Sequence, residues 1–220
     1  MTARSCVIIP AFNEEGSIGT VVHSLKPILD TVIVVNDNSS DETGSIARAA
    51  GAMVINHATN KGYDHAINSG FMSASEQGFE HILTFDADGQ HNPSDLKIML
   101  KKLRDNQADI VIGIRKKKAR WSEHILGLYA NHRFGIKDPL SGLKGYHIKL
   151  FHKYGAFSKY NMIGSELSFF AASQGSPLIQ MPIEIIKRQH TKPRFTGVLS
   201  GNEKILSALF KAVKLYGFKK

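Results

Sequence analysis

The sequence predicts an α/β fold with a mostly parallel central sheet and helices on both of its faces. Short apolar runs alternate with longer segments of helical periodicity up to about residue 115. Polar loops follow four of these runs, at Pro10, Asp37, Asn60 and Asp86. Such alternation is typical of parallel βαβ units, in which ligands bind outside the carboxyl ends of the strands. We therefore expect a binding site at that edge of the sheet.

The expected elements follow one another in this order. Strands are expected at residues 5–10, 31–35, 52–56, 81–85 and 109–114, then after a turn at 137–146, and at 179–187. Helices are expected at about residues 17–29, 39–50, 64–75, 93–105, 121–134, 166–173 and 203–216. The apolar strands carry few polar residues, as strands buried on both faces do.

Local signals place several helix ends in the first half. Ser39 with Glu42 three residues later forms a capping box, which predicts a helix start there, and Gly51 supplies the residue beyond its end. Asn92 and Pro93 combine an N-cap residue with proline at the first helical position, so a helix is expected to begin at residue 93.

The second half is less regular. Ser122 is expected to cap the helix at 121–134, and Glu166 to open the next one. Pro182 places the last strand at an edge or a bulge, because proline cannot donate to the ladder. The helix at 203–216 is amphipathic, and its expected apolar side consists of Ile205, Leu206, Leu209, Phe210, Val213 and Tyr216.

Length and composition indicate one domain, comprising residues 1–220, with 42% hydrophobic residues to build its core. No apolar run reaches the roughly 18 residues of a membrane-spanning helix, and we expect no signal peptide. The single cysteine, Cys6, excludes an internal disulfide and is typical of a reducing compartment. We therefore expect a cytoplasmic protein.

Charge is distributed unevenly along the chain. Residues 1–100 hold 5 Lys/Arg against 12 Asp/Glu, whereas residues 101–220 hold 23 against 7, within a net charge of +9. The basic half is expected to face an anion such as a phosphate, a lipid headgroup surface or a nucleic acid.

The acidic stretch Asp86-Ala87-Asp88-Gly89-Gln90 carries the main chemical signal. Two carboxylates one residue apart point into the same space, so the pKa of one must rise unless a cation lies between them. With the amide oxygen of Gln90 they form an all-oxygen ligand set that suits Mg²⁺ or Mn²⁺. Such a cation, held by few protein ligands, usually takes phosphate oxygens as its others.

Several motifs occur in a recognisable order over about residues 5–195. They are Val7-Ile8-Ile9-Pro10-Ala11-Phe12-Asn13-Glu14-Glu15, Val34-Val35-Asn36-Asp37-Asn38-Ser39-Ser40-Asp41, Asn60-Lys61-Gly62, Asp86-Ala87-Asp88-Gly89-Gln90-His91, Asp138-Pro139-Leu140-Ser141-Gly142 and Pro182 through Arg188. Together they resemble family 2 glycosyltransferases with the GT-A fold. The resemblance is strongest to dolichyl- or polyprenyl-phosphate mannose and glucose synthases.

The resemblance implies roles for individual residues. The implied nucleotide-binding set is Pro10, Phe12, Glu14, Val35, Asp37, Asn60, Lys61, Asp86 and Ala87. The metal ligands would be Asp86, Asp88 and Gln90, and the catalytic set Asp88, Arg188 and Glu166, with Arg188 meeting the diphosphate. The acceptor-binding residues would be Arg115, Arg120, Arg133 and Ser141. Residues 1–115 would bind the nucleotide-sugar, and residues 116–220 the acceptor.

The acceptor is expected to be a polyprenyl phosphate. Family 2 enzymes that glycosylate a sugar hydroxyl need a general base and commonly carry Glu-Asp near residue 166, where this chain has Glu166-Leu167. A phosphate monoester has its second pKa near ~6 and is already an anion at neutral pH. We therefore expect inverting transfer of a sugar from a GDP- or UDP-linked donor to a polyprenyl or dolichyl phosphate.

Other interpretations remain open from the sequence. A glycosyltransferase acting on a sugar hydroxyl in surface-polysaccharide or capsule assembly would use Glu166 or Asp138 as base. A nucleotidyltransferase would have a glycine-rich basic loop after the first strand, which is acidic here. No nucleic-acid motif is found, so no nucleic-acid partner is expected. The C-terminal helix is predicted either to lie on the cytoplasmic face of an anionic membrane or to pack on the sheet.

Overall fold

The structure, a computed structural model, describes residues 3–29, 31–186 and 198–218, the last range without the side chains of residues 198–200. Its centre is a seven-stranded sheet in the order β3-β2-β1-β4-β6-β5-β7. The strands are β1 (Ser5–Ala11), β2 (Thr31–Asn36), β3 (Met53–Asn56), β4 (His81–Thr84), β5 (Ile110–Arg115), β6 (Lys144–His147) and β7 (Leu178–Ile183). Within this sheet β6 runs antiparallel to β4 and β5, and the other pairs are parallel. The expected, mostly parallel α/β sheet is confirmed.

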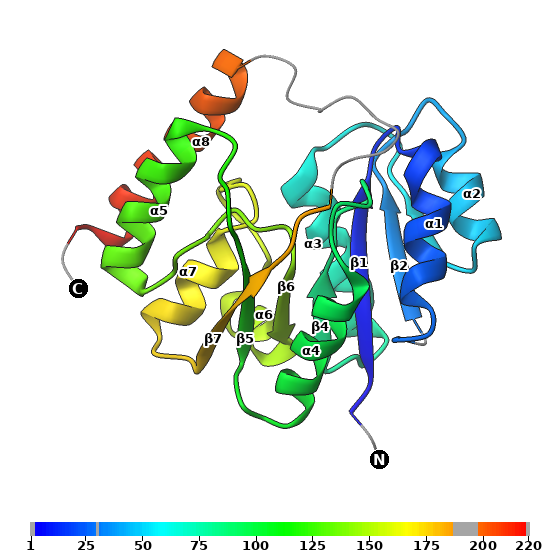
Figure 1. The fold of residues 1–220 in the computed structure, drawn as a ribbon, viewed down its shortest axis with the longest axis horizontal. Helices are drawn as coiled ribbons and strands as arrows, with labels where there is room; N and C mark the ends of the chain where they lie inside the picture. The colour runs from blue at the N-terminus through cyan, green and yellow to red at the C-terminus, as the bar shows by residue number, and fades with distance from the viewer. Residues whose placement is uncertain (1–2, 30, 187–197, 219–220) are drawn as a thin grey trace.

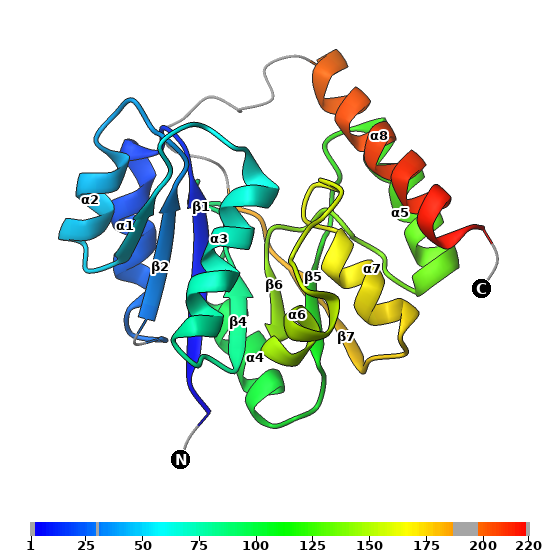
Figure 2. The same cartoon turned by 180° about the vertical axis from the view of Figure 1, so that it is seen from behind.

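Helices cover both faces of the sheet (Figures 1 and 2). They are α1 (Glu15–Leu25), α2 (Thr43–Ala49), α3 (Tyr63–Glu76), α4 (Pro93–Arg104), α5 (Trp121–Phe134), α6 (Ile148–Tyr154), α7 (Glu166–Ser173) and α8 (Val198–Tyr216). The apolar residues of α1, α2 and α4 form one buried cluster, and those of α3 and α5 to α8 form the other. Figure 1 shows α1 and α4 in front of the sheet, and Figure 2 shows α3 and α6 on its other face.

Alternation along the buried strands supplies both clusters. On β1, Val7 and Ile9 contribute to the cluster under α1 and α4, whereas Cys6 and Ile8 contribute to the cluster under α3. Successive side chains of a strand point to opposite faces, so a continuous apolar run is needed where both faces are covered. These buried strands hold the loops at their carboxyl ends in fixed positions.

Several local expectations need correction. The first helix was expected to reach residue 29, but it ends at Leu25, two residues before Pro27, and Leu29 is buried outside it. The capping box is absent, because α2 begins at Thr43 and the Ser39 hydroxyl instead accepts from the backbone N–H of Asn13. In contrast, Asn92 does cap α4, accepting from the N–H of Ser94 at 2.9 Å.

The second half also departs from expectation at two helix starts. The Ser122 hydroxyl does not cap α5 but donates to Oδ1 of Asn202 on α8, at 2.6 Å. The last helix begins at Val198, five residues before the expected start at residue 203. Pro182 lies in β7 at the edge of the sheet, as expected. No helix within the described ranges combines the length and apolar character needed to cross a membrane.

Candidate active site

The acidic stretch lies directly after β4, at the carboxyl edge of the sheet. Oδ2 of Asp86 lies 3.1 Å from Nε2 of His91, and Oδ1 of Asp88 accepts from the backbone N–H of Gln90 at 3.1 Å. The loop is also tied to the segment after β7, because Ile186 donates its N–H to the carbonyl of Gln90 and accepts from the Gln90 side chain. All three predicted metal ligands therefore lie in one short loop, which is fixed by the contact between Asp86 and His91 and by the hydrogen bonds between Gln90 and Ile186.

Gly142 lies against the carboxylate of Asp86. A Cβ built on Gly142 would come within 2.0 Å of Oδ2 of Asp86, closer than any real contact. The carbonyl of Gly142 also accepts from the hydroxyl of Thr84, at 2.8 Å. A side chain at this position would therefore displace the carboxylate of Asp86, because the backbone that leads into β6 lies directly beside it.

The chemistry of this loop fits a divalent cation. Two carboxylates and an amide supply hard oxygen ligands, and the contact from His91 would orient the carboxylate of Asp86 toward a bound ion. No group of three or more His, Cys, Asp or Glu side chains in the described ranges could hold a metal ion. The loop therefore suits a cation that takes its remaining ligands from a substrate.

Asp37 organises the part of the edge at which the sequence predicts nucleotide binding. Its Oδ1 lies 2.6 Å from Nδ1 of His57 and accepts from the N–H of Lys61 at 2.9 Å, while Oδ2 accepts from the N–H of Gly62 at 2.7 Å. The Asn60 side chain donates to the backbone carbonyl of Asp37. With three of about four acceptor positions filled, this buried carboxylate fixes the loop at 60–62.

The loop after β1 is fixed against the loop after β2. Pro10 and Val35 are register partners in adjacent strands, which places two predicted nucleotide-binding residues side by side. The N–H of Glu14 donates to the Thr43 hydroxyl at 2.7 Å, and the buried Glu14 carboxylate accepts from Ser17. Phe12, half-buried, lies between these anchored residues. Ala87, next to Asp86, is buried.

Arg115, a predicted acceptor-binding residue, forms a buried ion pair. Its Nε and Nη2 donate to the two oxygens of Asp138, each at 2.8 Å, and Nη2 also reaches Glu123 at 3.0 Å. Burial raises the pKa of Asp138, but the hydrogen bonds and charge of Arg115 outweigh it and hold that pKa below its usual value. Arg115 therefore holds two carboxylates, while its exposed part lines the cavity described below.

The other predicted acceptor residues are distributed along α5 and the loop before β6. Arg120 lies 3.7 Å from Glu123. Ser141 is buried, and its hydroxyl lies 3.4 Å from the carbonyl of Leu143. Arg133 donates to the carbonyl of Tyr216 and lies over the ring of Phe134, so it joins α5 to α8. These contacts place Arg133 in helix packing, and we do not retain it as an acceptor ligand.

Glu166 is fully buried and accepts four hydrogen bonds. Its Oε1 accepts from the Tyr154 hydroxyl and the N–H of Lys159, and its Oε2 from the Ser158 hydroxyl and the N–H of Tyr160, over 2.6–2.9 Å. A carboxylate with all its acceptor positions filled and no exposed surface is not placed to take a proton from a substrate. We therefore assign Glu166 to the structure of the loop at 158–160. Arg188 lies outside the described residues.

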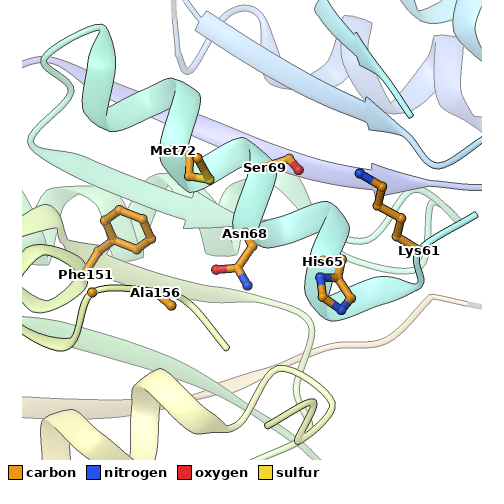
Figure 3. Close-up of a pocket in the computed structure, with 8 residues that line it drawn as sticks. Lys61, His65, Asn68, Ser69, Met72, Phe151 and Ala156 are labelled. Carbon is orange, nitrogen blue, oxygen red and sulfur yellow. The ribbon is translucent and has the colours of Figure 1, made fainter. Parts of the chain in front are cut away.

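A cavity of about 630 Å³ joins the acidic loop to the basic one. It is lined by Asp86, Gln90 and His91 from the acidic loop, by Arg115, Lys116 and Lys117 from the basic loop, and by Gly142. A second cavity, of about 260 Å³, runs along α3 between Lys61 and Phe151 (Figure 3). No carboxylate lines the second cavity, so the larger one is the candidate active site.

Three residues of this region were not predicted. His57 bridges Asp37 and the Ser69 hydroxyl, and His91 contacts Asp86. Lys144 is buried, and its ammonium group donates to the carbonyls of Pro139 and Gly164 at 2.7 and 2.6 Å. Burial lowers the pKa of Lys144 to about 8. His57 follows a strand end and His91 follows the acidic stretch, and both positions were signals that could have identified them.

Comparison with known proteins agrees with this architecture. A UDP-N-acetylglucosamine–dolichyl-phosphate N-acetylglucosaminyltransferase of Methanococcus voltae is 27% identical over 89% of this chain and 90% of its own. An undecaprenyl-phosphate mannosyltransferase of Micrococcus luteus is 28% identical over 90% of each chain. Glucosyl-3-phosphoglycerate synthase of Mycobacterium tuberculosis, solved with Mn²⁺, UDP and glucosyl-3-phosphoglycerate, superposes with a TM-score of 0.78 at 18% identity, over 99% of this chain and 81% of that one.

The likeness to solved structures confirms the expected GT-A fold, and the family match covers most of the chain. The matching family model is described as Glycosyl transferase family 2 and spans residues 6–161. It includes the loops after β1, β2 and β4, and among the residues that line the larger cavity it includes the acidic loop, the basic loop and Gly142. The protein is therefore a glycosyltransferase, and it belongs to glycosyl transferase family 2.

Proposed function

We propose that this enzyme transfers a sugar, with inversion, from a GDP- or UDP-linked donor to a polyprenyl or dolichyl phosphate. The observation that carries the proposal is the cavity of about 630 Å³, in which an acidic loop and a basic loop face the same space. The acidic loop suits a cation bound to a diphosphate, and the basic loop suits a second anion. The relatives named for lipid-phosphate acceptors match this chain along most of its length.

The reaction needs no general base when the acceptor is a phosphate. An oxygen of the phosphate monoester, already an anion near neutral pH, forms a bond to the anomeric carbon as the bond from that carbon to the diphosphate breaks. Mg²⁺ or Mn²⁺ held by Asp86, Asp88 and Gln90 would neutralise charge on the departing nucleoside diphosphate. Lys116 and Lys117 supply positive charge where the acceptor phosphate binds.

In this proposal one half of the chain binds the nucleotide-sugar and the other half binds the acceptor. Residues 1–115 provide the nucleotide side through Pro10, Asp37 and the loop at 60–62, and residues 116–220 provide the acceptor side. Arg188, outside the described residues, keeps its proposed role at the diphosphate. The proposal places the enzyme on the cytoplasmic face of a membrane, where a lipid-linked acceptor is found.

Transfer to a sugar hydroxyl is the competing function, and the two carboxylates available to it are already engaged. Glu166 accepts four hydrogen bonds, and Asp138 is held by Nε and Nη2 of Arg115. We expect Glu166→Gln to lower the melting temperature, because the amide nitrogen would meet N–H and O–H donors, while the shape of the pH–rate profile is kept. Loss of one limb of that profile would instead favour a sugar-hydroxyl acceptor.

The test is a donor panel of UDP- and GDP-sugars with Mn²⁺ or Mg²⁺ and a short-chain polyprenyl phosphate, with the product identified by mass spectrometry. We expect a polyprenyl-phosphate sugar with one donor class, and its loss in Asp88→Asn. The anomeric configuration, read by NMR, should be the opposite of the donor's. Product formed on sugar acceptors alone, or no dependence on a divalent cation, would contradict the proposal.

A further inference from the structure

An exposed apolar surface lies on α5 and α8, apart from the cavity. On α5 the exposed apolar residues are Trp121, Ile125 and Leu128, which are 56%, 41% and 71% exposed. On α8 they include Leu206 and Phe210, which are 36% and 71% exposed and are followed on the same side by the half-buried Val213, whereas the exposed Leu215 lies on the opposite side of the helix from Leu206. We call the five exposed residues the apolar face. Both sets have the i, i+4, i+7 spacing that places side chains on one side of a helix.

The two helices lie side by side and run in the same direction (Figures 1 and 2). Ser122 bonds to Asn202 near their starts, the Tyr129 hydroxyl donates to the carbonyl of Ala212, and Arg133 donates to the carbonyl of Tyr216 near their ends. These contacts link residues separated by 80 and 83 positions. The same offset brings Leu128 level with Phe210, so the two apolar sets adjoin along the helices.

The five residues of the apolar face also point away from the core, although Val213 packs in part against it. Ala130 on α5 and Ala208 on α8 are fully buried and mark the inner side of each helix. On each helix the apolar set lies roughly a quarter turn from the helix–helix contact, on the side opposite these alanines. The two sets therefore form one outward surface rather than two separate ones.

The charged residues on α8 and in the loop before α5 are mostly basic. The helix α8 carries Lys204, Lys211 and Lys214 against one acidic residue, the exposed Glu203. Next to α5, the loop at residues 115–120 is rich in Lys and Arg, and the one acidic residue of α5, Glu123, is buried in ion pairs with Arg115 and Arg120. Apolar residues with a basic surround are typical of helices that lie in the interface of an anionic bilayer.

The apolar face also adjoins the active site. Lys116, Lys117 and Ala119 line the cavity, and Trp121 begins the apolar face two residues later. An acceptor with a phosphate head and an isoprenoid tail could thus enter the cavity while its tail stays in the bilayer. We propose that the apolar face of α5 and α8 is the surface by which this protein lies on an anionic membrane. The link to the acceptor rests on the proposed function, whereas membrane binding itself does not.

Trp121 is the single tryptophan of the chain, so its fluorescence reports on this surface. We expect a blue shift with vesicles rich in phosphatidylglycerol, quenching by lipids brominated in the acyl chains, and a weaker response with phosphatidylcholine alone. The double variant Leu128→Ser/Phe210→Ser should reduce vesicle binding by about tenfold or more, because two large apolar side chains no longer enter the bilayer.

The matched control is Met72→Ser/Ile98→Ser, which removes two apolar side chains that are 55% and 47% exposed on α3 and α4. We expect the control to bind vesicles as wild type does. An unchanged Trp121 spectrum, or equal loss in both double variants, would overturn the proposal. Wild-type dimers that become monomers in Leu128→Ser/Phe210→Ser, without vesicle binding, would also overturn it and assign the face to self-association.

Transfer assays separate this proposal from the proposed function. The variant Leu128→Ser/Phe210→Ser should keep its rate with a short-chain, water-soluble polyprenyl phosphate and lose at least tenfold with a long-chain acceptor embedded in vesicles. If no polyprenyl phosphate accepts a sugar while Trp121 still inserts into vesicles, the proposed function is contradicted. The proposal that the apolar face binds membranes would then still stand. If wild type and variant have equal rates on the embedded acceptor and bind vesicles equally, the proposal about the apolar face is overturned, and the proposed function is not.

Discussion

Gly142 is the residue at which the backbone before β6 lies against the predicted metal ligand Asp86. In Gly142→Ala the new methyl group would lie within the carboxylate of Asp86, so that carboxylate or the start of β6 must move. We expect transfer activity to fall by roughly 10²-fold, with little change in melting temperature. Isothermal titration of Mn²⁺ with nucleoside diphosphate should show weaker binding.

The control for Gly142→Ala is Gly19→Ala on α1. There a new Cβ would meet a single side-chain carbon of Ile46, at 3.0 Å, and helix propensity favours alanine. Full activity in Gly142→Ala, or the same loss in Gly19→Ala, would show that the close approach to Asp86 has no part in the site.

His81 makes stability depend on pH. Both of its ring nitrogens are buried without a hydrogen-bond partner in the described structure, and burial lowers its pKa. The folded protein thus favours neutral His81. The resulting contribution to the free energy of unfolding is complete above the ordinary histidine pKa of about 6.5 and is lost as pH falls below that value. We expect the melting temperature to fall between pH 7.5 and 5.5, and to fall less in His81→Phe. Equal slopes for the two proteins would contradict this assignment.

At the scale of elements, one hydroxyl joins α5 to the end of α8. The Tyr129 hydroxyl lies 3.0 Å from the carbonyl of Ala212 and 2.9 Å from that of Gly217. Tyr129→Phe should lower the free energy of unfolding by about 1–3 kcal/mol, measured by urea denaturation. Tyr160→Phe, at a residue that is 47% exposed, is the control and should change little. A loss in the control as large as in Tyr129→Phe would refute a specific role for this hydroxyl.

Elements with strong local signals could be predicted from the sequence. Asn92 and Pro93 placed the start of α4 correctly, because the cap and the proline act within one turn. The polar loops after β1, β2 and β4 could also be assigned to one edge, since the carboxyl ends of parallel strands meet there. The loops of the candidate site were thus predictable from the alternation of strands and helices along the chain and from the polar residues that follow the strands.

Contacts between distant segments could not be predicted in this way. Ser39 lost its expected cap because its hydroxyl accepts from Asn13, 26 residues earlier. The pairing of His57 with Asp37 spans 20 residues, and Ser122 meets Asn202 across 80. The four donors that occupy Glu166 come from residues that no motif relates to it, so its role as a base could be judged only from the folded chain.

The whole molecule divides into an acidic and a basic half, which should make acceptor binding sensitive to salt. Residues 101–220 hold 23 Lys/Arg against 7 Asp/Glu, and two of these lysines line the cavity beside Arg115. Raising ionic strength from 0.05 to 0.5 M shortens the Debye length to a few ångströms. We expect the KM for a short-chain polyprenyl phosphate to rise about tenfold, without loss of the fold by circular dichroism. An unchanged KM would show that this charge does not act on the acceptor.

The absence of space between Asp86 and Gly142 has a consequence for the order of events in one turnover. A carboxylate that adjusts to an arriving cation cannot move toward Gly142 without displacing the backbone that also carries Ser141. We therefore expect the backbone at residues 141–142 to reach its final shape after the donor binds, and we expect compulsory-order kinetics with the nucleotide-sugar first. Once the nucleotide has left, the carboxylate of Asp86 would no longer be fixed, and the backbone at Gly142 could move again. We expect this movement to release the glycosylated product before the next acceptor binds.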